Sequence, residues 1–189
     1  MNKIGKIRKS LFLRLIPPIY HQDKSIRIIL YKWFLVGLLI RLTFMPFTLH
    51  SDIISVYWRA YLSISHKIPW LSGTETFIRF LHIFFLWIFK PLMPYFPAVS
   101  NIQTMPASCS PKMFSVFVNN SMVFRTLFLF KLPYLFFDLG CAFLFLKIFK
   151  DNKNKLYAFK FWMVNPIVIF AVYIFGRYES ITIFFILLS

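Results

Sequence analysis

Cysteine is scarce in this chain, and the two residues that occur, Cys109 and Cys141, lie far apart. Their number and spacing exclude a disulfide framework and a cysteine metal site. His50, His66 and His82 do not have metal-ligand spacing, so we expect no metal and no cofactor. We expect the first apolar run to be a retained helix, because the amino terminus is long and basic and no small-x-small cleavage site follows that run.

Acidic residues are also few. Six Asp and Glu stand against 22 Lys and Arg, which gives a formal net charge of +16. In a soluble protein this excess would suggest nucleic-acid binding. Here apolar types make up 59% of the residues and aromatic types 21%, more than a soluble core of this size can bury. The charges lie between apolar runs, so we predict an integral membrane protein that contacts anionic membrane lipids and no nucleic acid.

Apolar runs near membrane-crossing length divide most of the chain. A helix needs about 20 residues to cross the hydrocarbon of a bilayer. We predict an all-α, polytopic transmembrane helical bundle over residues 28–189, with about five spans plus a truncated sixth. The short last run favours a chain that is the front part of a longer protein. The predicted spans are Ile28–Phe47, Phe77–Pro97, Met113–Phe130, Leu132–Phe149 and Tyr157–Phe175, followed by half a helix at Ile181–Ser189.

The distribution of charge predicts an orientation. Residues 1–27 form a strongly basic segment, which the positive-inside rule places in the cytoplasm. The loop at 48–76 carries as many acids as bases, so we expect it on the non-cytoplasmic face. The loop at 150–155 is basic again, which puts the Gly176–Ser180 turn on the same outer face as Asp52.

This alternation constrains the number of spans. An even number must lie between Asp52 and Lys131, so the runs at 77–97 and 113–130 either both cross the membrane or both do not. We prefer that both cross, because two apolar runs of about 20 residues are hard to leave unspanned.

Apolar residues recur at intervals of three and four after Asp52, which predicts a short helix lying in the membrane interface. Asp52 would stand at the start of that helix, near the positive end of its dipole, where a carboxylate stays ionised. The alternative is an acid that is merely solvated. The recurring residues are Ile53, Ile54, Tyr57, Trp58 and Tyr61.

Two charges fall inside predicted spans, where they are costly unless they face protein or water. Arg41 lies in the first span and is a candidate for holding a carboxylate or a phosphate. Snorkelling to the far interface is an equal alternative. Asp138 should take a partner from another helix, with Arg41 as a candidate, and a structural role is favoured over a catalytic one.

Several residues carry a resemblance to a known family. Asp52, Tyr57 and Ala60 follow the first span at a spacing that resembles the start of the GT-C superfamily of polytopic glycosyltransferases. The block Phe161–Pro166, which leads to Gly176–Ser180, is similar to the Asn-Pro helix and the Gly-Gln-Tyr-Asp type loop of that superfamily.

The segment Lys131–Pro133 with Asp138 resembles the helix that usually lies between those two motifs. The resemblance covers about residues 28–189, in the expected order. The chain departs from the pattern in two places: Asp52 is not part of an Asp-x-Asp pair, and Glu179 stands where Asp is more frequent. The carboxyl half of such an enzyme is missing, so the chain resembles its amino-terminal portion.

The resemblance implies a multi-pass enzyme of a prokaryotic plasma membrane or the endoplasmic reticulum. It would transfer a sugar, with mannose as a candidate, from a polyprenyl-phosphate carrier to a lipid or protein acceptor on the non-cytoplasmic face. Asp52 would be the catalytic base, since sugar transfer requires removal of the acceptor proton and a holder for the departing phosphate. The candidate substrate-binding residues are Arg59, Arg177, Tyr178 and Glu179.

Each role has a simpler alternative, and two other functions stay open. Arg177 could pair with phosphate through its planar fork or could be an interfacial arginine. Glu179 could order Arg177, bind sugar hydroxyls or be an exposed loop acid.

The chain could instead be a transporter subunit with Arg41 and Asp138 on a substrate path, or a non-catalytic assembly partner that docks through its last half-helix.

Overall fold

The computed structural model describes residues 24–65, 76–94 and 111–189, and within these ranges every regular element is helical. The basic segment predicted over residues 1–27 lies outside the described residues as far as residue 23. In chain order the elements are α2 (Lys24–Phe47), α3 (Ser51–Ser65), α4 (Thr76–Phe89), the 3₁₀ turn η2 (Lys90–Leu92), α5 (Pro111–Val118), α6 (Val123–Ile148), α7 (Asn152–Val164), α8 (Pro166–Ile169), the π-helix η4 (Phe170–Ile174) and α9 (Glu179–Leu188).

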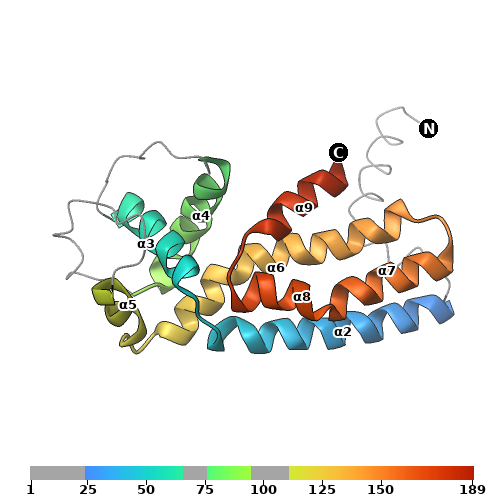
Figure 1. Cartoon of the computed structure of the whole chain (residues 1–189), viewed down its shortest axis with the longest axis horizontal. Coiled ribbons are helices and arrows are strands. Elements are labelled where there is room, and N and C mark those ends of the chain that lie inside the picture. The colour runs from blue at the N-terminus through green and yellow to red at the C-terminus, as the bar shows by residue number, and fades with distance from the viewer. Residues whose placement is uncertain (1–23, 66–75, 95–110) are drawn as a thin grey trace, which may run out of the picture.

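Helices α2 and α6 pack antiparallel along the length of the molecule (Figure 1). Arg41 in the last third of α2 contacts Asp138 near the middle of α6. At the end of α2, Thr48 accepts a hydrogen bond from Lys131 in the first third of α6. With 24 and 26 residues, the two helices extend about 36 and 39 Å, longer than the hydrocarbon core of a bilayer.

The segment from α7 to η4 runs parallel to α2 and is bent by 40° at one break. Asn165 ends α7, and its side-chain oxygen accepts a hydrogen bond from Ile167 N–H at 2.9 Å. Pro166 then occupies the first helical position of α8, where a missing N–H costs nothing. The close approach to α2 depends on Gly37, because a Cβ there would lie 2.6 Å from the carbonyl oxygen of Met163.

Two of the described helices, α2 and α6, are long and apolar enough to cross a membrane, and the bent segment from α7 to η4 makes a third if it counts as one span. Their outer surfaces expose large apolar side chains, as lipid-facing helices do. Leu39 is 63% exposed, Phe136 66% and Ile167 75%. The prediction of an all-α bundle is therefore confirmed, whereas the prediction of five spans is wrong.

The run at Phe77–Pro97 does not form a span, because α4 has 14 residues, about 21 Å of helix, and gives way to a 3₁₀ turn at Lys90–Leu92. The run at Met113–Phe130 is also interrupted. The break lies at Asn120, whose side chain accepts a hydrogen bond from Met122 N–H at 2.8 Å. Helix α6 then begins at Val123. The predicted boundary at Lys131–Pro133 instead lies inside α6.

For the two uncertain runs at 77–97 and 113–130, the described helices correspond to the option that we did not prefer, in which neither run crosses the membrane. Neither uncertain run forms a helix long enough to cross, so the α3 end of the molecule and the start of α6 lie together (Figure 1). Basic residues gather at the opposite end, where α2 begins and where α6 connects to α7. The described ones are Lys24, Arg27, Lys32, Lys147, Lys150, Lys153, Lys155 and Lys160.

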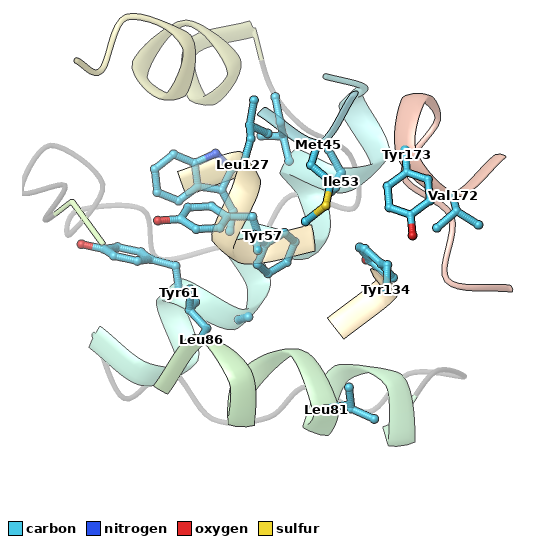
Figure 2. Packing of buried hydrophobic residues seen from close by; sticks show 14 of the residues in the cluster. Met45, Ile53, Tyr57, Tyr61, Leu81, Leu86, Leu127, Tyr134, Val172 and Tyr173 are labelled. Atoms are coloured by element: carbon cyan, nitrogen blue, oxygen red, sulfur yellow. The ribbon is translucent and has the colours of Figure 1, made fainter. Parts of the chain in front are cut away.

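Helix α3 forms where the sequence predicts a short helix, but its apolar face is buried in the protein. Figure 2 shows this face among side chains of α4, α6 and η4. The ring of Tyr57 lies edge-on to Phe117 at 5.0 Å and to Phe130 at 5.3 Å. Packing against protein therefore fixes the orientation of α3, and with it the position of Asp52.

Candidate functional site

Three charged side chains meet where α3 and α9 begin, at the end of α2 that lies away from the basic connection (Figure 1). Arg177, in the loop after η4, places Nη1 3.7 Å from Oδ2 of Asp52, in the first turn of α3. Its Nε donates a hydrogen bond of 2.8 Å to Oε1 of Glu179, the first residue of α9. All three side chains are 45–47% exposed, so the cluster is open to solvent and to a ligand.

The guanidinium of Arg177 therefore lies between two carboxylates. The hydrogen bond and the negative charge of Glu179 raise the pKa of Arg177 above its ordinary value, and Asp52 adds to this effect. The second carboxylate oxygen of Glu179 is buried and has no hydrogen-bond partner within the described ranges. Glu179 thus orders Arg177 with its accessible oxygen, while its other oxygen faces the protein.

His50 fixes the start of α3. Its Nδ1 accepts a hydrogen bond from the backbone N–H of Asp52 at 3.2 Å, which satisfies one of the free amides of the first turn. The ring stacks on Phe175 with centroids 3.9 Å apart. An acceptor at Nδ1 requires the proton of the neutral ring to be on Nε2. The imidazole therefore joins α3 to the loop that carries Arg177.

The backbone of this loop depends on Gly176, whose φ of 79° lies in the left-handed region. A Cβ at this position would also lie 2.8 Å from Cβ of Ile53 in α3. The π-helix η4 ends directly before the loop, and Arg177 N–H bonds back to the carbonyl oxygen of Ala171 at 2.9 Å. These features bring the loop against α3 and Arg177 to Asp52.

Replacement of Gly176 by Ala should lower the free energy of unfolding by about 1–3 kcal/mol, because it adds both backbone strain and overlap with Ile53. Thermal unfolding in detergent micelles measures the change. Ser121→Ala, at an exposed turn, is the control and should stay within about 0.5 kcal/mol. Equal stability of the two variants would contradict the stated role of Gly176.

A buried ion pair lies deeper in the bundle. Nε of Arg41 is 2.5 Å from Oδ2 of Asp138, and both side chains are fully buried. Tyr173 donates its hydroxyl to the same oxygen at 2.7 Å, and Trp162 Nε1 donates to the other oxygen at 2.8 Å. Arg41 also donates hydrogen bonds to the backbone oxygens of Gly37, Trp162 and Met163.

The predicted partnership of Asp138 with Arg41 is thus confirmed, and snorkelling of Arg41 is excluded. The pair joins α2, α6, α7 and η4 at one point. A buried charge pair with complete hydrogen bonding holds elements in register and offers no reactive group. We therefore assign Arg41 and Asp138 a structural role.

Lys131 connects this network to the exposed cluster, a role that the sequence did not reveal. Its ammonium is fully buried and donates to Oγ1 and the carbonyl oxygen of Thr48 and to the carbonyl oxygen of Tyr173. These distances are 2.6–2.8 Å. Thr48 leads into His50, and Tyr173 leads into the Arg177 loop. In the sequence, Lys131 was noted only as the start of the Lys131–Pro133 segment before a predicted span.

Four of the five predicted site residues are thus close together. The ring of Tyr178 is centred 6.0 Å from Cζ of Arg177 and precedes α9 directly. Arg59 is half-buried, seven residues beyond Asp52 on α3, about 10 Å along the helix. Within the described ranges no three His, Cys, Asp or Glu side chains are placed to hold a metal ion.

An apolar groove of about 630 Å³ lies between α4 and α9. It begins at Ile181, two residues after Glu179, and extends along α9 to Ser189. Its wall is almost entirely aliphatic and aromatic, which suits a hydrocarbon chain rather than a sugar. The lining residues are Phe77, Ile78, Ile181, Thr182, Phe185, Ile186 and Ser189.

Comparisons with known proteins do not identify the chain. No protein-family model matches it, and no curated protein or solved structure shows significant similarity. The site must therefore be interpreted from its own geometry.

Proposed function

We propose that the chain is an integral membrane glycosyltransferase of the GT-C type, or the amino-terminal portion of one. It transfers a sugar, with mannose as the candidate, from a polyprenyl-phosphate carrier to a lipid or protein acceptor. The observation that carries the proposal is the meeting of Asp52, Arg177 and Glu179 at the start of α9, whose later residues line an apolar groove. A polyprenyl-phosphate sugar has the matching parts: an anionic phosphate, a polar sugar and a long hydrocarbon chain.

The side chains of the cluster have complementary tasks in this reaction. Asp52 takes the proton of the acceptor hydroxyl while the acceptor oxygen attacks C1 of the sugar, and the bond from C1 to the phosphate oxygen breaks. Arg177 carries five N–H donors, so it can hold Glu179 and still pair with the departing phosphate. Oε1 of Glu179, which already accepts from Arg177, accepts a second hydrogen bond from a sugar hydroxyl.

The proposed orientation follows from the two charged ends. Basic residues flank the connection from α6 to α7 and the start of α2, so that end faces the cytoplasm and anionic lipid. The cluster then opens on the non-cytoplasmic face of a prokaryotic plasma membrane or of the endoplasmic reticulum. The alternative of a transporter finds no support in the intramembrane charges, because Arg41 and Asp138 are fully buried and bonded to each other.

Arg177→Gln tests the role of the phosphate holder. Loss of a charge-assisted hydrogen bond should raise KM for the polyprenyl-phosphate sugar roughly tenfold or more. Transfer of radiolabelled sugar in membranes containing the full-length protein measures this. The matched control is Arg125→Gln, an exposed arginine in the first turn of α6. An unchanged KM in Arg177→Gln, or an equal rise in the control, would contradict the role.

A further inference from the structure

Two ammonium groups lie over one indole ring at the basic end of the molecule. Nζ of Lys160, in α7, is 4.4 Å from the centre of the Trp33 ring, in α2, and Nζ of Lys32 is 5.9 Å from it. Both lysines are exposed. The ring attracts each cation, but the two positive charges repel each other, so a shared anion would stabilise the arrangement.

The acids of the described ranges do not neutralise this pair. Asp52 and Glu179 bind Arg177 at the opposite end, and Asp138 is buried against Arg41. Asp151 is nearer to the pair along the chain, but its side chain caps α7 by accepting a hydrogen bond from Asn154 N–H at 3.1 Å. The positive charge around Trp33 is therefore available to an external anion.

An exposed apolar stripe continues from Lys32 toward the middle of α2. Leu35, Val36 and Leu39 follow Lys32 by three, four and seven residues, so all four lie on one helix face. Their exposed fractions are 55%, 37% and 63%. A cation at the head of such a stripe, beside a tryptophan, matches a lipid headgroup with its acyl chain below it.

We propose that Lys32, Trp33 and Lys160 form a binding site for one anionic phospholipid. The phosphate group lies between the two ammonium groups, the headgroup lies against the indole, and an acyl chain follows Leu35 and Leu39. The site is at the opposite end from Asp52. It rests on the proposed membrane placement and not on sugar transfer.

The test uses the full chain in nanodiscs that contain phosphatidylglycerol and phosphatidylcholine. Native mass spectrometry of the released protein measures how much phosphatidylglycerol stays bound. Lys32→Gln with Lys160→Gln should weaken retention by about fivefold for each lysine. The matched control, Lys150→Gln with Lys153→Gln, removes the same charge from the same end and should change retention less than twofold. Replacement of both Lys32 and Lys160 by Arg should restore binding.

Three outcomes would overturn the proposal. Equal losses in the test and control pairs would show diffuse attraction instead of a site. Displacement of the lipid by millimolar inorganic phosphate would show an anion site with no need for the acyl chain. Failure of the wild-type chain to enter nanodiscs would remove the membrane placement. If the double glutamine variant does not fold, the single variants Lys32→Gln and Lys160→Gln carry the same comparison, each with about a fivefold loss expected.

Discussion

Asp138→Asn should destabilise the protein by about 3–5 kcal/mol, since the change leaves the buried charge of Arg41 without its counter-ion. Asn has nearly the same shape as Asp, so packing is retained while the charge is lost. With its amide oxygen in the place of Oδ2, its NH2 group faces the Trp162 N–H, which loses the acceptor Oδ1. A loss of this size is a large part of the stability of a typical domain.

Denaturant or thermal unfolding in detergent micelles measures the effect of Asp138→Asn. Asp151→Asn is the matched control, because Asn is also a good N-cap residue and the position is exposed. It should lower the free energy of unfolding by less than about 0.5 kcal/mol. Combining Asp138→Leu with Arg41→Met should cost less than the sum of the two single changes, because no isolated charge remains. A loss below about 1 kcal/mol for Asp138→Asn would mean that the pair behaves as a surface ion pair.

Part of this arrangement could be predicted from the sequence, because charges inside apolar segments leave few options. A buried Asp138 called for a partner from another helix, and Arg41 was one candidate, with snorkelling of Arg41 as an equal alternative. The alternation of basic and balanced loops also placed Asp52 near the Gly176–Ser180 turn, and the contact between Asp52 and Arg177 agrees with that placement. Helix α2 ends at Phe47, as the predicted span does, and begins at Lys24, four residues before the predicted start at Ile28.

The number of spans could not be predicted, because hydropathy does not show where a helix breaks. Two asparagines at 119–120 end one helix, whereas Pro133 is accommodated inside α6. The burial of Lys131 depends on oxygens of Thr48 and Tyr173, which come from distant parts of the chain. The apolar face of α3 packs against protein instead of lying in the membrane interface. A protein core and a membrane interface both favour apolar residues at these positions, so the sequence does not distinguish them.

The second large effect concerns Asp52, the proposed base. Asp52→Asn keeps the size of the side chain and the start of α3, but an amide cannot take the acceptor proton. General base catalysis contributes a factor of about 10²–10⁴, so kcat should fall by about 100-fold or more. The amount of folded protein should be unchanged, because the Asp52 side chain is half exposed and its ion pair with Arg177 is 3.7 Å long.

Sugar transfer by the full-length protein, compared between wild type, Asp52→Asn and the control Asp151→Asn, tests the central claim most directly. The assay supplies labelled polyprenyl-phosphate mannose and membrane lipid as acceptor, with expression measured in parallel. The proposal predicts transfer by wild type and Asp151→Asn and a loss of about 100-fold or more in Asp52→Asn. Wild-type transfer that persists in Asp52→Asn at an equal level of protein would contradict catalysis by Asp52.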